Sequence, residues 1–204
     1  MKIIAVANQK GGVAKTTTAV NIAAAIAHKG LKVALIDLDP QGNASTGVGL
    51  SLSERANTIY DVLVNNIDIN TAKYKSSVDN LVVVPADIDL SAAEVELLRI
   101  NNKEFILRNA LSKLVDADYV IIDCPPSLGQ LTLNALSAAD SLIIPMQCEF
   151  YALEGLSHLL KTVDIVQKNL NRKLKILGVL LSMHDKRNRL TEQVEIDVRS
   201  CLGE

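Results

Sequence analysis

One segment near the N-terminus combines glycines, lysines and threonines in an order that suits phosphate binding. It lies between an apolar strand-like run and an apolar helix-like run, and it reads Asn8-Gln9-Lys10-Gly11-Gly12-Val13-Ala14-Lys15-Thr16-Thr17. Glycines let successive backbone N–H groups point inward, and the N-terminal end of the following helix adds a positive dipole. The segment therefore predicts an anion cradle, with Lys15 on the β- and γ-phosphates, Thr16 on Mg²⁺ and Thr17 on an α-phosphate oxygen.

The segment departs twice from the common phosphate-loop pattern G-x-x-x-x-G-K-[ST]. Gln9 stands at the first glycine position, and Ala14 stands directly before the second lysine. We expect Ala14 to have a negative φ where the loop enters the helix, because a left-handed conformation strains any residue with a Cβ. The alternative interpretation is a Gly/Thr turn beside two ordinary surface lysines.

Three acidic side chains follow two other apolar runs. Asp37 and Asp39 come at the end of one run, and Asp123 ends another, directly before Cys124. Asp123 has the sequence context of a Walker B acid, which typically holds Mg²⁺ through a bound water. Unpaired carboxylates at one edge of a sheet need a cation, although a solvated Asp at the end of a strand is the alternative.

A parallel sheet would bring these side chains together, and the apolar pattern predicts one. Short buried strands are expected at residues 3–7, 33–36, 81–84, 119–122, 142–145 and 176–181. Helices are expected at residues 16–28, 92–98, 105–115, 131–138, 153–168 and 190–202. This alternation predicts an α/β fold of the P-loop NTPase class, a doubly wound, mostly parallel sheet with helices on both faces. Asn8, Asp37 and Asp123 then share the carboxyl edge, where such sheets bind ligands.

Composition favours a single domain over residues 1–204 with an aliphatic core, because hydrophobic residues make up 49% and Trp is absent. Residues 40–75 are expected to form a polar surface excursion with a short helix near residues 59–64. The formal charge of −2 means that attraction to nucleic acid requires a local patch. Three scattered cysteines suit reduced thiols. Without a signal peptide or membrane-length apolar stretch, we expect a cytoplasmic protein and no membrane partner.

Four motifs together resemble the ParA/Soj/MinD family of ATPases. They are K-G-G-x-x-K-[ST] at residues 10–16, DLDPQGNAS at 37–45, IIDCPPS at 121–127 and CEFYALEGL at 148–156. The resemblance covers essentially the whole chain and is closest to the ParA/Soj proteins that partition chromosomes or plasmids. It implies a deviant Walker A loop in which Lys10 to Thr17 bind ATP, with Mg²⁺ as cofactor and slow hydrolysis without a partner.

The resemblance also implies roles for three residues at the site. Lys10 resembles the signature lysine that reaches across an ATP-bound homodimer to the partner's phosphates. Asp39 resembles the acid that orients the attacking water, and Asp37 resembles its neighbour in the magnesium shell. An ordinary surface lysine is the alternative interpretation of Lys10.

A basic segment near the C-terminus, with Lys186, Arg187 and Arg189, resembles segments of ParA/Soj proteins that bind DNA non-specifically. The family implies a ParB-like partner that stimulates hydrolysis, and a location on the nucleoid. A solvated loop is the alternative for this segment. Family members usually continue with a further strand and helix beyond this point, so we expect the chain to lack those elements.

Three other functions compete with partitioning. A MinD-like membrane regulator would require an amphipathic terminal helix, and none is visible in the sequence. A nucleotide-binding scaffold with little turnover would follow if Ala14 and the absent segment abolished hydrolysis. A metabolic enzyme of the same superfamily would need a substrate site or cluster-binding cysteines, which the sequence does not display.

Overall fold

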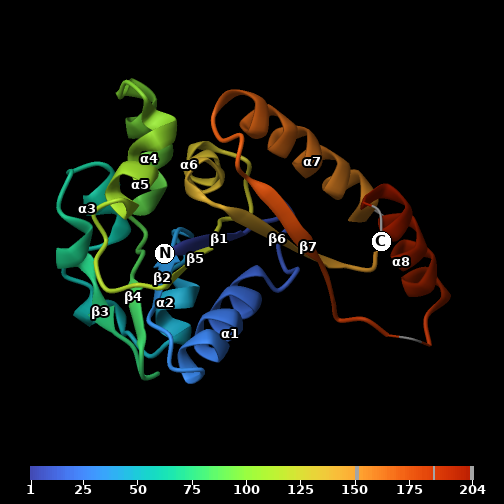
Figure 1. Ribbon diagram of the computed structural model, residues 1–204, viewed down its shortest axis with the longest axis horizontal. Coiled ribbons are helices and arrows are strands. Elements are labelled where there is room, and N and C mark those ends of the chain that lie inside the picture. The colour runs from blue at the N-terminus through green and yellow to red at the C-terminus, as the bar shows by residue number, and fades with distance from the viewer. Residues whose placement is uncertain (150–151, 186, 203–204) are drawn as a thin grey trace.

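The computed structural model describes residues 1–149, 152–185 and 187–202, with a seven-stranded sheet through its centre (Figure 1). The strand order is β3-β4-β2-β5-β1-β6-β7, and every neighbouring pair is parallel except β3 and β4. The strands are β1 (Lys2–Val6), β2 (Val33–Asp37), β3 (Tyr74–Lys75), β4 (Leu81–Val84), β5 (Tyr119–Asp123), β6 (Ser141–Gln147) and β7 (Lys175–Ser182). The predicted mostly parallel, doubly wound sheet is confirmed.

Helices cover both faces of this sheet (Figure 1). One face carries α1 (Lys15–His28) and α2 (Asn43–Gly47). The other carries α3 (Ile59–Leu63), α4 (Leu90–Glu96), α5 (Ile106–Leu111), α6 (Gln130–Ala138) and α7 (Ala152–Asn169), and α8 (Arg189–Leu202) packs against α7 beyond β7 (Figure 1). Short 3-10 helices are η1 (Leu52–Glu54), η2 (Ile69–Ala72), η3 (Leu97–Arg99) and η4 (Lys103–Phe105).

Alternation along β1 explains the two aliphatic cores. Ile4 and Val6 are buried on the side of α1, whereas Ala5 and Ala7 are buried in the opposite layer. Successive side chains of a strand point to opposite faces, so a continuous apolar run is the signature of a strand covered on both sides. The α1 helix lays small side chains one turn apart against this sheet, namely Ala19, Ala23 and Ala27.

Strand register brings two acids side by side at the carboxyl edge of the sheet. Val6 pairs with Asp123, and Asp123 pairs with Asp37. Paired residues of neighbouring parallel strands point to the same face, so the two carboxylates are neighbours one strand apart. The loop that leads into α1 leaves the sheet beside them, at the end of β1.

The structure differs from the expected elements in the helix at 105–115 and in the excursion at 40–75. The apolar pattern predicted a helix over 105–115, but α5 ends at Leu111 because the next bonds, from Lys113 to Ala110 and from Leu114 to Leu111, span only three residues. The excursion at 40–75 contains α2 and the two-residue antiparallel strand β3, in addition to the expected short helix. Both elements are too short to show a periodic signal.

Candidate nucleotide site

Side chains outside the loop between β1 and α1 hold it in place. The buried Asn8 donates from Nδ2 to the Pro145 carbonyl at 2.7 Å and accepts from the Lys10 N–H at 3.0 Å. The Ser182 hydroxyl donates to the Val13 carbonyl at 3.0 Å. Within the part of the chain that the structure describes, the backbone N–H groups of residues 11–17 have no protein acceptor. A row of free N–H groups at the start of a helix is what an anion cradle requires.

Ala14, directly before α1, has φ 67° and ψ 32°, so the expectation of a negative φ was wrong. Its carbonyl accepts the Thr18 N–H at 2.9 Å and the Thr18 hydroxyl at 2.7 Å, which fixes the first turn of the helix. The chain therefore enters α1 through a residue in the left-handed region. For a residue with a Cβ this conformation costs about 1–2 kcal/mol.

An open cavity of about 340 Å³ lies over this loop. The residues that line it come from the loop, from α1 and from three later segments: Gly11, Gly12, Ala14, Lys15, Thr16, Thr17, Asp39, Asn43, Pro126 and Met183. Lys15 is buried and donates from Nζ to the Lys10 carbonyl at 2.8 Å. Burial lowers the pKa of Lys15, and the carboxylates of Asp123 and Asp39 oppose that shift. The ammonium group therefore lies among acids at the floor of the site.

The three predicted acids occupy different surroundings. Asp37 is fully buried and accepts the Ser45 N–H at 2.8 Å and the Ser45 hydroxyl at 2.7 Å; its pKa is raised by burial, which these bonds oppose. Asp39 lines the cavity and accepts the Gln41 N–H at 3.0 Å. Burial raises the pKa of Asp123 to about 7, against a lowering contribution from the Thr16 hydroxyl.

Asp123 provides the test of whether a magnesium ion fits. Both carboxylate oxygens are buried and have no hydrogen-bond partner of ordinary geometry among the described residues. A carboxylate buried in this way is costly unless a cation or water satisfies it. The described residues contain no group of three or more His, Cys, Asp or Glu that could hold a metal alone. The donor set therefore fits Mg²⁺ held through the Thr16 hydroxyl, waters and phosphate oxygens.

Lys10 lies outside the phosphate cavity in this structure. It forms an ion pair with Glu149, just after β6, and it lines a second cavity with Gln9, Ser127 and His158. The Lys10 ammonium is thus held by an acid of its own chain, and it must leave that acid to reach any phosphate.

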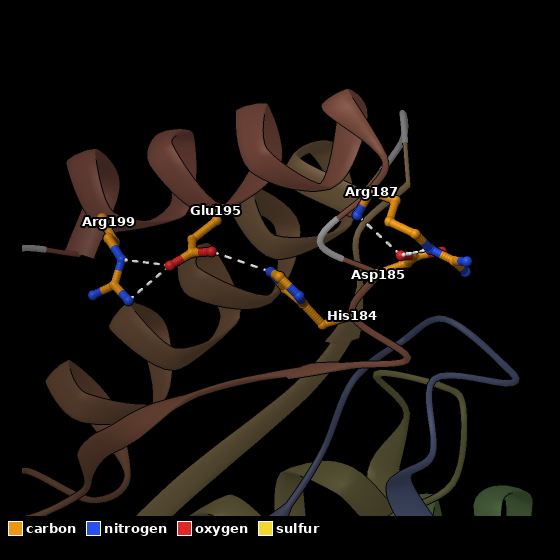
Figure 2. Close-up of polar contacts among 5 residues, drawn as sticks. All are labelled: His184, Asp185, Arg187, Glu195 and Arg199. Atoms are coloured by element: carbon orange, nitrogen blue, oxygen red, sulfur yellow. Dashed lines mark hydrogen bonds and ion pairs between the residues drawn. The ribbon is translucent and has the colours of Figure 1, made fainter.

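The predicted DNA-binding segment follows β7, and Lys186 lies outside the described residues. The Arg187 side chain is 89% exposed and donates twice to Asp185, from Nε at 3.0 Å and from Nη2 at 2.9 Å, and the Arg187 backbone N–H donates to the same carboxylate at 3.0 Å (Figure 2). Arg189 is exposed at the start of α8. The basic charge of the segment is therefore partly offset by its own acid.

Deeper in the same region, Glu195 of α8 receives two partners (Figure 2). His184 contacts it at 3.1 Å, and Arg199 donates to it at 2.9 Å. His184 is thus a loop residue that ties the segment to α8.

Sequence reasoning missed several residues at the site. Asn43 and Pro126 lie inside the quoted motifs, so their place in the cavity could have been inferred. No sequence pattern indicated that Met183 lies at the cavity, because it reaches the cavity through a turn with φ 52° after β7. Glu94 of α4 accepts the Gln130 N–H at 2.6 Å at the start of α6, which follows Asp123 in the chain.

This chain is similar to a protein family and to individual proteins whose descriptions agree with one another. A family model described as an AAA domain matches residues 1–176. The chromosome partitioning protein ParA of Caulobacter vibrioides is 49% identical over all of this chain and 78% of its own length. The sporulation initiation inhibitor protein Soj of Bacillus subtilis is 52% identical over 97% of this chain and 79% of its own length.

Solved structures place the fold in the same group. A Mycobacterium smegmatis protein described as cobyrinic acid a,c-diamide synthase, with bound ADP and magnesium, superimposes with a TM-score of 0.93. It is 43% identical, and the match covers 98% of this chain and 82% of that one.

Proposed function

Because this chain belongs to the ParA/Soj family of chromosome-partitioning ATPases, we propose that nucleotide state switches its binding to non-specific DNA. The chain is an ATPase that uses ATP and Mg²⁺, as its relatives and the nucleotide-bound neighbour indicate. In the proposed cycle ATP brings two chains together, the dimer binds DNA, and a ParB-like partner stimulates hydrolysis and release. The protein acts in the cytoplasm, on the nucleoid.

The observation that supports this proposal most directly is the link between the phosphate cavity and the basic segment. Met183 lines the cavity, and the exposed Arg187 and Arg189 follow within the same segment. A change at the phosphates therefore acts on the backbone that carries both arginines. Single phosphate contacts are weak and salt-dependent, so two copies on one dimer face would convert a small change in geometry into a large change in affinity.

Hydrolysis on this proposal is mainly a matter of positioning and charge. Lys15 neutralises the β- and γ-phosphates, and the Asp39 carboxylate orients the attacking water at the cavity wall. Thr16 and Asp123 would hold the magnesium ion, while Asp37 would add negative charge from the next strand. When bound, Mg²⁺ supplies neutralisation of the phosphate oxygens and holds them in line for displacement.

Lys10 is the residue that we assign to the dimer. Its ion pair with Glu149 is partly exposed, and exposed pairs contribute little, about 0–1 kcal/mol. Exchange of Glu149 for the phosphates of a second chain is therefore a low-cost step. The gain is a cation placed where charge develops in the transition state.

A metabolic role is the second candidate, because the Mycobacterium smegmatis neighbour is described as a diamide synthase. Such an enzyme would use ATP to act on a carboxylic acid substrate, rather than to drive a cycle of DNA binding and release. None of the described helices combines the length and apolarity of a membrane span.

The test is binding to random-sequence duplex DNA with ATP, with ADP and without nucleotide, at about 50 and about 200 mM salt. We expect ATP-dependent, salt-sensitive binding that Lys15→Gln abolishes and Asp39→Ala retains. The double change Arg187→Ala/Arg189→Ala should weaken binding and reduce the salt slope by about 0.9 for each lost phosphate contact.

The matched control is Arg172→Ala/Lys173→Ala, which removes two exposed basic side chains from the turn between α7 and β7. This variant should bind DNA like the wild type. Binding that is indifferent to nucleotide would overturn the proposed switch. Nucleotide binding without phosphate release would instead identify a scaffold, and ATP use that depends on a carboxylic acid rather than DNA would identify the metabolic alternative.

A further inference from the structure

Arg55, just after η1, is a buried cation without an acidic partner. It is 7% exposed and makes no salt bridge with any carboxylate in the described residues. Its guanidinium donates instead to three carbonyl oxygens and one hydroxyl. The acceptors are Ala86 O at 2.7 Å, Thr46 Oγ1 at 2.7 Å, Leu50 O at 2.9 Å and Gly42 O at 3.3 Å.

Burial of this guanidinium group costs free energy. A buried charge that is not paired with an opposite charge loses its hydration, and dipoles compensate for it only in part. The Nε–H of Arg55 is also buried without an acceptor among the described residues. An apolar side chain of similar volume would cost less, so the guanidinium is explained better by the groups that it holds than by stability.

The held groups belong to the segment that carries Asp39. The Gly42 N–H donates to the Asp39 carbonyl at 2.9 Å, which closes a four-residue turn at the cavity wall. Gly42 has φ 63° and precedes α2, and the Thr46 N–H donates to its carbonyl at 3.1 Å. Arg55 therefore donates hydrogen bonds both to the end of this turn and to α2.

Gly42 and the guanidinium fit each other closely. A Cβ at Gly42 would overlap the Arg55 side chain and would lie 2.8 Å from the Ala86 carbonyl oxygen. The turn thus packs directly against the Arg55 side chain. Arg55 in its place donates to the carbonyl of Ala86, just beyond the end of β4.

A second set of contacts also holds α2. Asp37, at the end of β2, accepts from the N–H and hydroxyl of Ser45, and the Ser45 hydroxyl accepts the Ala86 N–H at 3.3 Å. The segment that presents Asp39 is therefore held by two sets of contacts, from Asp37 at the end of β2 through Ser45 and from Arg55 through Gly42 and Thr46.

We propose that Arg55 is a positioning residue for ATP hydrolysis, which fixes the turn from Asp39 to Gly42 and thereby the Asp39 carboxylate at the phosphate cavity. The proposal rests on the role assigned above to Asp39. It does not involve the phosphate loop, which Arg55 does not contact. Loss of Arg55 should therefore slow turnover and leave nucleotide binding almost unchanged.

The experiment compares Arg55→Met, Arg55→Lys, Thr46→Val and Asp39→Ala in steady-state hydrolysis, ADP binding and thermal denaturation. Small misplacement of a catalytic group can cost up to about 10²-fold in rate. We expect Arg55→Met to lower kcat about tenfold or more, with KM and the ADP Kd within about threefold. Arg55→Lys and the milder Thr46→Val should give intermediate losses, and the double variant Arg55→Met/Asp39→Ala should be no slower than Asp39→Ala.

The control is Asn171→Ala, which removes two side-chain bonds to the carbonyls of Leu136 and Ala139, at 3.0 and 2.7 Å, in a turn that does not line the cavity. It should lower Tm and leave kcat unchanged. Normal kcat in a folded Arg55→Met beside a slow Asp39→Ala would overturn the role of Arg55 alone. Full hydrolysis by Asp39→Ala would overturn the role of Asp39 itself. If Arg55→Met does not fold, normal kcat in Thr46→Val and Arg55→Lys would overturn the proposal.

Discussion

Ala14→Gly should stabilise the nucleotide-free protein, although glycine is normally a destabilising replacement for alanine next to a helix. Ala14 stands at φ 67° and ψ 32°, a conformation that glycine adopts without penalty. Its Cβ is the source of the strain, and the bonds that its carbonyl accepts from Thr18 involve only backbone atoms of residue 14. The substitution therefore removes the strain and keeps every contact.

The magnitude follows from two opposing effects. Relief of the left-handed conformation contributes about 1–2 kcal/mol. The greater freedom of glycine in the unfolded chain costs about 0.4–1 kcal/mol. The net gain is about 0.5–1 kcal/mol, which for a domain of this size raises Tm by about 1–4 °C.

Thermal denaturation without nucleotide, followed by circular dichroism, measures this change. The matched control is Ala25→Gly, an exposed position inside the same helix, where the substitution should cost about 1 kcal/mol and lower Tm. The two substitutions should thus shift Tm in opposite directions. A decrease in Ala14→Gly as large as that in Ala25→Gly would refute the reasoning, because it would mean that no strain is present at residue 14.

Three further predictions concern the same edge of the sheet. Burial raises the pKa of Asp123 to about 7, so the folded chain binds this proton more tightly than the unfolded chain. The free energy of unfolding of the nucleotide-free protein should therefore fall as pH rises from about 4 to about 7. Asp123→Asn should flatten that slope in a series of Tm values measured across this pH range. Mg·ADP at about 100 times its Kd should add about 2.7 kcal/mol, or about 5–11 °C in Tm, and Lys15→Gln should lose most of this shift; an equal shift in both proteins would exclude Lys15 from phosphate binding. Glu94→Ala should cost about 0.5–2 kcal/mol in urea denaturation, because it leaves the Gln130 N–H at the start of α6 without its acceptor, and a loss near zero would show that water replaces the carboxylate.

Much of the fold was predictable because buried parallel strands appear in the sequence as short aliphatic runs. The runs that became β1, β2 and β5 each end at or near a polar site residue, so the edge that carries Asp37 and Asp123 followed from chain order and handedness. The phosphate loop was predictable for a similar reason, since its residue types are dictated by ligand chemistry.

Other features have no local signal. Ala14 was expected to avoid the left-handed region on propensity alone, and the geometry of the loop overrides that preference. Arg55 binds backbone carbonyls, which every residue possesses, so its partners leave no trace in the sequence. The pairing of Lys10 with Glu149 joins residues 139 positions apart, and only the folded sheet brings them together.

The pair of neighbouring carboxylates at the ends of β2 and β5 also has a consequence for how long each molecule survives. Burial raises the pKa of Asp123 and the neighbouring Asp37 carboxylate adds to that shift, so the empty fold at neutral pH carries a destabilisation that a bound cation would offset. Magnesium–nucleotide is therefore a folding ligand as well as a substrate. A fall in the total supply of magnesium–nucleotide, ADP included, should therefore raise the population of open molecules and speed their proteolysis.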